Sequence, residues 1–265
     1  MNNQKLVSQM NSGVLRIIDG DEVAGNDYDY VVLLAAIYDG QVQRQCTASL
    51  LSSKWGLTAA HCLESYLHPE GLKFLYIWYC NFTISPVHTK FYSKVLELFI
   101  HPHYLFSHNN HKIELNDIAL VRVKDVFLVN YGKLLATDYQ AVLGHEVTSI
   151  GGGQMEQNEK FSLQDELRPL QYFKGVVITC DKSYLDKISY PLICVASKCS
   201  RKTQMGHYGD SGGPLIHGSK IIGILVTVTP SHITAYVPLS PYLHWIWYVI
   251  NTKSSDGSHN NTDHL

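Results

Sequence analysis

The sequence lacks a long apolar run, a strong excess of charge and any CxxC pair of cysteines. No apolar stretch reaches the ~18 residues that a membrane-spanning helix requires. The formal net charge is −2, so nothing predicts binding to nucleic acid or to an acidic membrane surface. Hydrophobic residues make up 45% of the chain and charged residues 17%, a balance that is typical of folded proteins and excludes global disorder.

The six cysteines favour disulfides over a structural zinc site, because such a site needs closely spaced pairs and the shortest spacing here is Cys194 to Cys199. Two glycosylation sequons, beginning at Asn81 and Asn260, fit an oxidising secretory route. Residues 1–16 contain no apolar core of a signal peptide. We therefore expect a secreted, extracellular protein whose leader is absent from this sequence; the alternative is that the cysteines stay reduced.

Short runs rich in β-branched residues recur along the chain, and turn-forming residues separate them, as at 38–40 and 217–219. This alternation predicts an antiparallel sandwich or barrel rather than βαβ units. The predicted strands are 31–37, 57–60, 74–79, 118–123, 147–150, 175–179, 192–195, 221–228 and 233–237.

A helix is predicted near the end of the chain, with Ser240 as its N-cap and Pro241 in its first turn. After Asn251 the tail, residues 252–265, is polar and predicted to be disordered. The apolar residues expected on one face of the helix are Leu243, Ile246, Trp247 and Ile250.

Three segments carry the candidate chemistry: LTAAHC at 57–62, NDIAL at 116–120 and GDSGGP at 209–214. Each has an ordinary structural explanation when taken alone: a core histidine, a capping aspartate and a glycine loop. Their occurrence together, in the order His, Asp, Ser, favours a catalytic explanation.

Acyl transfer at neutral pH needs an activated hydroxyl, a base within hydrogen-bond reach and a group that fixes the tautomer of the base. We expect Ser211 to be the nucleophile, His61 the general base and Asp117 the group that orients the histidine. Glycines beside Ser211 open the backbone to a substrate. The N–H groups of Gly209 and Ser211 could form an oxyanion hole, in which one donor contributes ~3 kcal/mol of transition-state stabilisation.

With these motifs, residues 17–251 resemble the chymotrypsin-like (trypsin-fold) serine peptidases. The resemblance implies an all-β fold of two six-stranded antiparallel β-barrels packed together, with a C-terminal α-helix and the active site in the cleft between the barrels. It also implies two disulfides, Cys46–Cys62 and Cys180–Cys194. The expected domain organisation is a propeptide at 1–16, the peptidase domain at 17–251 and a disordered tail at 252–265.

Residues 16–20, RIIDG, resemble the site at which such enzymes are activated by cleavage. Cleavage after Arg16 would give Ile17 a new α-amino group, and the resemblance implies that this ammonium pairs with Asp210. A buried ammonium requires a partner of this kind. The alternative is an ordinary basic residue before a strand.

The expected substrate pocket departs from the family pattern. Met205 stands where trypsin-like members carry an aspartate, so recognition of Arg or Lys is not expected. Val226 replaces a serine, and His207 replaces a cysteine of a family disulfide. Small apolar side chains at the P1 position are the expected preference, unless Met205 fills the pocket. The residues assigned to the pocket are Met205, Tyr208, Val226, Val228 and Thr234.

Cys80 and Cys199 have no expected partner and are interpreted as free thiols. The segment that leads to Asp117 carries several histidines, and a solvated loop is favoured there over a metal site. No metal or cofactor is expected. These histidines are His101, His103, His108 and His111.

The sequence leaves two candidate functions for the protein. The first is a secreted serine endopeptidase with non-trypsin-like specificity, made as a zymogen; the second is a non-catalytic homologue that binds or regulates other proteins. The expected partners of the enzyme are peptide or protein substrates, an activating trypsin-like protease and protein inhibitors. We expect a monomer that binds neither nucleic acid nor membranes.

Overall fold

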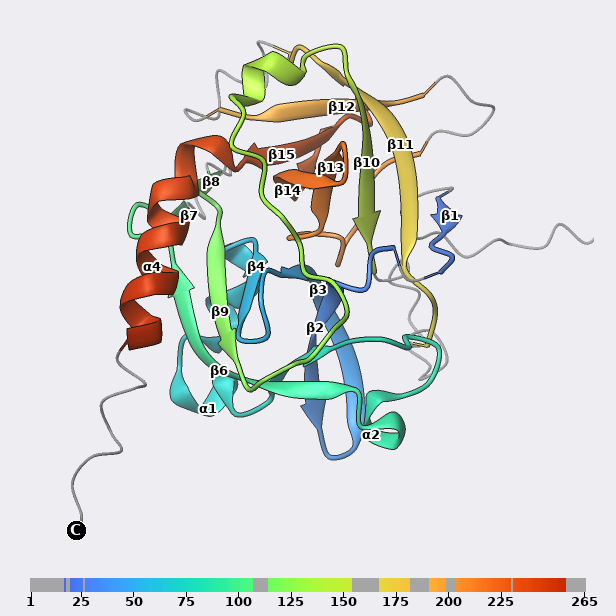
Figure 1. The fold of residues 1–265 in the computed structure, drawn as a ribbon. Helices are drawn as coiled ribbons and strands as arrows, with labels where there is room; N and C mark the ends of the chain where they lie inside the picture. Colours follow the sequence, from blue (N-terminus) through green and yellow to red (C-terminus); the bar gives the residue numbers. More distant parts are fainter. Residues whose placement is uncertain are drawn as a thin grey trace, which may run out of the picture.

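Figure 1 shows the chain as a computed structural model, with the two halves of the fold one above the other. The structure describes residues 17, 20–25, 27–106, 114–153, 167–181, 191–198, 204–229 and 231–255. Among these residues, no helix is both long enough and apolar enough to cross a membrane.

The first half of the chain forms a closed antiparallel barrel, which occupies the lower part of Figure 1. Its strands are joined in the order β2-β3-β4-β9-β6-β5. They are β2 (Val31–Tyr38), β3 (Gln41–Leu50), β4 (Trp55–Thr58), β5 (Leu75–Trp78), β6 (Tyr92–Ile100) and β9 (Ala119–Val123).

The turn between β2 and β3 shows how the sequence starts this barrel. Asp39 and Gly40 both have positive φ, at 48° and 75°. Two such residues between paired strands form a type of turn whose twist matches that of a hairpin, and Asp-Gly is among its favoured sequences. The predicted turn at 38–40 therefore sets the register in which Tyr38 faces Gln41.

The second half of the chain forms the upper barrel, in which β11 pairs with β12 and closes a ring of six antiparallel strands. Every second residue of β11 is buried, as expected for a strand with one face on a core. The predicted fold class is therefore confirmed. The strands are β10 (Glu146–Gly151), β11 (Gln171–Ile178), β12 (Ile193–Ser197), β13 (Pro214–His217), β14 (Lys220–Val228) and β15 (Thr234–Pro238), with β1 (Asp21–Glu22) added beside β11.

Short elements fill the connections between these strands. They are η1 (His61–Tyr66), α1 (Pro69–Leu72), α2 (Pro86–Thr89), β7 (Leu105–Phe106), β8 (Glu114–Leu115), η2 (Tyr139–Val142) and η4 (Ser240–Tyr242), and η4 leads directly into the long helix α4 (Leu243–Ser255).

Helix α4 follows the last strand of the second barrel and descends along the first barrel (Figure 1). Ile246 and Val249 are buried in the larger apolar core, whereas Trp247, which was predicted on the same helical face as Ile246, is 63% exposed. The apolar pattern alone cannot say which side of a helix rich in aromatic residues meets the barrel. The helix also runs to Ser255, past its expected end at Asn251.

Ser240 does not cap this helix, so that prediction was wrong. Leu239 occupies the cap position of η4, and no side chain bonds there. The Oγ of Ser240 instead accepts a hydrogen bond of 3.2 Å from the N–H of Tyr139. The predicted tail beyond Ser255 lies outside the described residues.

Candidate active site

His61 and Asp117 meet because two neighbouring strands of the first barrel end at the same place. Strands β4 and β9 are antiparallel, and Thr58 at the end of β4 pairs with Ala119 at the start of β9. His61 lies three residues beyond Thr58 and opens η1, and Asp117 lies two residues before Ala119. The register of this strand pair therefore carries both side chains to one end of the barrel.

The carboxylate of Asp117 holds His61 at two points. His61 Nδ1 lies 2.6 Å from Oδ2, and the backbone N–H of His61 donates to Oδ1 over 2.9 Å. Asp117 is fully buried, and the side chain of His61 is 23% exposed. A hydrogen bond from Nδ1–H to the carboxylate fixes the tautomer in which Nε2 is the basic nitrogen.

The backbone before Asp117 is fixed by Asn116, which has a positive φ of 53°. Its amide donates to the carbonyl of His103 over 2.8 Å, and its Oδ1 accepts a hydrogen bond of 3.0 Å from the hydroxyl of Tyr242. Burial, with the nearby charge of Asp117, raises the pKa of Tyr242 to about 12. Tyr242 therefore remains a hydrogen-bond donor at neutral pH, and it ties the Asp117 loop to the start of the C-terminal helix.

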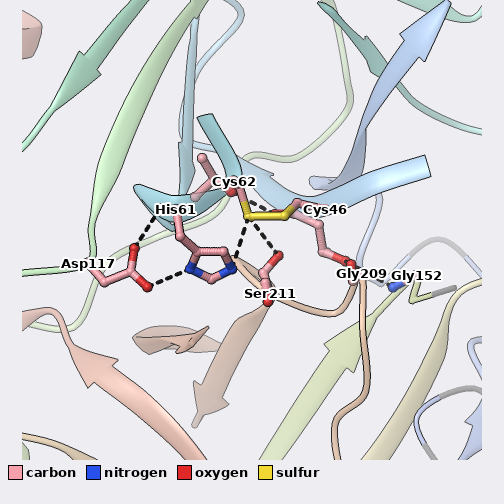
Figure 2. Close-up of a disulfide and its surroundings, with 9 residues drawn as sticks. Cys46, His61, Cys62, Asp117, Gly152, Gly209 and Ser211 are labelled. Atoms are coloured by element: carbon pink, nitrogen blue, oxygen red, sulfur yellow. Dashed lines mark hydrogen bonds and ion pairs between the residues drawn. A yellow bond between two sulfur atoms is a disulfide. The ribbon is translucent and has the colours of Figure 1, made fainter. Parts of the chain in front are cut away.

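Ser211 belongs to the second barrel and approaches His61 beside a disulfide (Figure 2). Cys46 in β3 and Cys62 in η1 form this bond, with Cα atoms 6.0 Å apart. The Cys62 sulfur lies 3.8 Å from His61 Nε2 and 3.7 Å from the backbone oxygen of Ser211. Asp117 therefore lies on the Nδ1 side of the imidazole. The Cys62 sulfur lies near Nε2, and the same sulfur contacts the backbone oxygen of Ser211.

Glycines shape the turn that carries Ser211. Gly209 and Gly212 have positive φ values of 84° and 79°, and a Cβ added at Gly212 would collide with Thr58 and with the backbone of β3. The backbone hydrogen bonds of the turn use the N–H groups of Asp210, Gly212 and Gly213. The N–H groups of Gly209 and Ser211, the two predicted oxyanion donors, take no part in these bonds.

Asp210, the residue before Ser211, is fully buried. Its carboxylate accepts the N–H of Gly153 over 2.6 Å and the N–H of His207 over 2.8 Å. Burial raises the pKa of Asp210 to about 6, although the two backbone hydrogen bonds and the charges of Arg168 and Arg44 act in the opposite direction. The hydrogen bonds and the two arginines therefore offset only part of the cost of burying this negative charge.

Arg44 is a buried cation that the sequence analysis did not identify. It is fully buried and donates to the carbonyls of Gly152, Phe82 and Arg168, at 3.1, 3.1 and 2.6 Å. Its guanidinium also lies 5.0 Å from the centre of the Trp78 ring. Nothing in the polar stretch around Arg44 distinguishes it from an exposed strand residue, because its partners are backbone carbonyls from distant parts of the chain.

The residues predicted for the substrate pocket are only partly brought together. Val228 and Thr234 face each other across β14 and β15, and Thr234 accepts a hydrogen bond of 3.1 Å from the N–H of Gly206, next to Met205. Val226 is buried, whereas Tyr208 is 77% exposed and lies at the surface. A cavity of about 300 Å³ lies elsewhere, between the segment after β1 and the loop after β5, and none of the predicted site residues lines it.

The remaining predicted residues are distributed as follows. Cys180 and Cys194 form the second disulfide, and Cys80 is an exposed free thiol. His101 packs edge-on against the rings of Tyr242 and Trp245, and burial lowers its pKa. Arg16, His108, His111 and Cys199 lie outside the described residues.

One group of potential metal ligands occurs in the part of the chain that the structure describes. It consists of Cys46, His61 and Cys62, whose donor atoms lie within 4.8 Å of one another. Both sulfur atoms are joined in a disulfide. They are therefore not available as thiolate ligands for a metal such as zinc.

The comparisons with known proteins agree with this fold and site. The family model described as Trypsin matches residues 17–246, so the chain belongs to the trypsin family. It is 27% identical to serine protease SSP1 of Scolopendra subspinipes, over 91% of this chain and 85% of that protein. It is also 27% identical to human kallikrein-15, over 87% of this chain and 90% of that protein.

Among solved structures, the chain is similar to mouse neuropsin, described as a serine protease expressed in the limbic system of the brain. The TM-score is 0.68 at 20% identity, and the match covers 88% of this chain and 99% of that chain. Because the identity is low, this likeness concerns the fold. Family and fold together support serine endopeptidase activity.

The buried carboxyl of Asp210 predicts a pH dependence of stability in the uncleaved chain. Its pKa is about 6 in the folded state against an ordinary value of 3.8, so the folded state binds the proton more tightly. The resulting stabilisation is complete below about pH 4 and is lost as the pH rises through 6, by about 3 kcal/mol at most. Urea unfolding of Asp210→Asn should lack this component.

The matched control is Asp39→Asn, which changes an exposed carboxylate in the β2–β3 turn. It should keep the wild-type dependence on pH between 4 and 7. An Asp210→Asn variant whose free energy of unfolding changes with pH in parallel with the wild type would contradict the account of this buried carboxyl.

Proposed function

We propose that Ser211, His61 and Asp117 form the catalytic triad of this endopeptidase. The observation that carries the proposal is the contact between the His61 imidazole and the buried Asp117 carboxylate, which is 2.6 Å long and is supported by a second hydrogen bond to the backbone of His61. A histidine held in this way has its Nε2 lone pair on the side away from the aspartate. That is the side where the turn carrying Ser211 meets the disulfide (Figure 2).

In the proposed reaction, the hydroxyl oxygen of Ser211 attacks the carbonyl carbon of the substrate and its proton moves to His61 Nε2. Asp117 stabilises the imidazolium that forms. The N–H groups of Gly209 and Ser211 stabilise the oxyanion. The imidazolium then gives its proton to the leaving amine, and an acyl-enzyme remains on Ser211. Water, activated by the same histidine, releases the acid and restores the serine.

The alternative is a non-catalytic homologue that uses the same fold for binding. The rebuilt substrate strand, with Val226 in place of a serine, is the observation that favours it. The enzyme is preferred because each residue type that acyl transfer needs is present, and because Asp117 is buried against the histidine rather than exposed.

Activation by cleavage after Arg16, by a trypsin-like protease, is the second part of the proposal. The side chain of Ile17 is fully buried in the core of the second barrel. Asp210 offers a buried carboxylate that lacks full compensation of its charge. A new ammonium on Ile17 would supply that compensation and lower the pKa of Asp210. Pairing would then organise the turn that carries Ser211.

The specificity proposed is for small apolar P1 side chains. Met205 brings no negative charge to the pocket, and Val228 with Thr234 narrows it from two neighbouring strands. An Arg or Lys side chain would lose its hydration there without gaining a counter-charge.

We also propose that the enzyme acts outside the cell as a monomer, on peptide or protein substrates and under the control of protein inhibitors. The two disulfides support this location, because such bonds persist in oxidising compartments.

Substitution of the orienting aspartate should lower turnover without unfolding the protein. Asp117→Asn keeps the shape of the side chain but favours the wrong tautomer of His61, which in this kind of triad lowers kcat by about 10⁴. Asp125→Asn, at an exposed aspartate that pairs with Lys54, should leave kcat unchanged. Peptide hydrolysis by the protein cleaved after Arg16 measures both. Equal kcat values for wild type and Asp117→Asn would exclude the proposed role.

A peptide library tests the specificity. The cleaved enzyme should favour Ala or Val over Arg at P1 by at least about 10-fold in kcat/KM, since an unpaired buried cation is costly. Met205→Asp should shift this ratio towards Arg by adding a counter-charge. Efficient cleavage after Arg or Lys by the wild-type enzyme would refute the proposed pocket.

A further inference from the structure

Thr47 lies in β3 of the first barrel, next to Cys46, and it is fully buried. Its backbone N–H donates to the carbonyl of Ser211 over 2.9 Å. Its hydroxyl donates to the carbonyl of Gly209 over 2.9 Å and accepts the N–H of Gly152 over 3.0 Å. All three partners belong to the second barrel, so a single residue of the first barrel contacts two separate segments of the other.

The two carbonyls that Thr47 holds lie on either side of the nucleophile turn. The Gly209 carbonyl belongs to the peptide group that joins Gly209 to Asp210, and the Ser211 carbonyl belongs to the one that joins Ser211 to Gly212. Fixing these two groups fixes the direction of the backbone through Ser211. Gly209 has a φ of 84° and no side chain to restrain it. Its peptide group is held on the N–H side by the bond from Asp210 to the carbonyl of His207 and on the carbonyl side by Thr47.

The hydroxyl of Thr47 has one proton to donate, and the Gly209 carbonyl receives it. It accepts a hydrogen bond from Gly152, which lies just after β10 (Figure 2 shows Gly152 and Gly209 on the same side of the disulfide). The carbonyl of Thr47 accepts a further hydrogen bond of 2.9 Å from Thr58 Oγ1 in β4. Thr47 is thus anchored in its own barrel, on the strand next to β4, which leads to His61.

We propose that the Thr47 hydroxyl is a positioning group for catalysis: it sets the orientation of the Gly209 peptide and thereby places Ser211 and the oxyanion donors against His61 across the interface between the barrels. This inference rests on the proposed triad. It assigns to Thr47 no contact with substrate.

The matched variants are Thr47→Val, which keeps the shape and removes the hydroxyl, and Thr47→Ser, which keeps the hydroxyl and removes the methyl group. In the enzyme cleaved after Arg16, Thr47→Val should lower kcat by about 10- to 100-fold and change KM by less than about 3-fold, because a small displacement of reacting groups is costly. Thr47→Ser should restore kcat to within about 3-fold of the wild type.

Ser93→Ala is the control for lost stability. Ser93 is a buried residue of the first barrel, away from Ser211, and its hydroxyl donates to the carbonyl of Lys124 over 2.6 Å. This variant loses one buried hydrogen bond, as Thr47→Val does, and should lower Tm without changing kcat. A wild-type kcat in folded Thr47→Val, or an equal loss in Thr47→Ser, would overturn the proposal.

Hydrogen exchange separates this inference from the triad itself. In the uncleaved chain carrying Ser211→Ala, which needs no activity, Thr47→Val should increase amide exchange in peptides that contain Gly152 or Gly209–Gly213. Thr47→Ser and Ser93→Ala should not. Unchanged exchange in Thr47→Val would overturn the positioning role even if the wild type hydrolyses peptides. Increased exchange in Thr47→Val, together with a wild type that hydrolyses no peptide, would support the structural contact of Thr47 with the second barrel and overturn its role in catalysis.

Discussion

The proposed active site depends on the contact between β3 and the turn that carries Ser211. His61 and Asp117 belong to one barrel and Ser211 to the other, so no strand pairing within a barrel sets the distance between the proposed base and the proposed nucleophile. Thr47 bonds across this boundary, and the disulfide from Cys46 fixes the same strand to the histidine. β3 therefore connects the segment that carries His61 in the first barrel to the turn that carries Ser211 in the second barrel.

A second feature of the interface is its buried charge. Asp210 of the second barrel and Arg44 of β3 are both fully buried, and each is bonded largely to the backbone. The carbonyl of Gly152 accepts from Arg44 and the N–H of Gly153 donates to Asp210, so the single peptide group between Gly152 and Gly153 connects the two charges. Buried charges demand such partners. The turn that carries Ser211 thus lies against a polar network, which the proposed new ammonium on Ile17 would change directly.

The sequence indicated the candidate site more fully than it indicated the packing. His61, Asp117 and Ser211 stand in short motifs whose residue types follow from acyl transfer, and turns such as 38–40 follow from local backbone preferences. Three strands of the two barrels were missed, β3, β6 and β13, because β3 and β6 interleave polar residues and β13 is short. The roles of Arg44 and Thr47 in β3 depend on carbonyls far away in the chain, which no local pattern encodes.

The central claim is that Ser211 is a nucleophile activated within this fold. It is tested most directly by treating the chain with trypsin, verifying cleavage after Arg16, and adding a fluorophosphonate probe that reacts with activated serines. The account predicts one probe per cleaved chain, located on Ser211 by peptide mass mapping and absent from Ser211→Ala. A folded, cleaved chain that shows no Ser211-dependent labelling would contradict it.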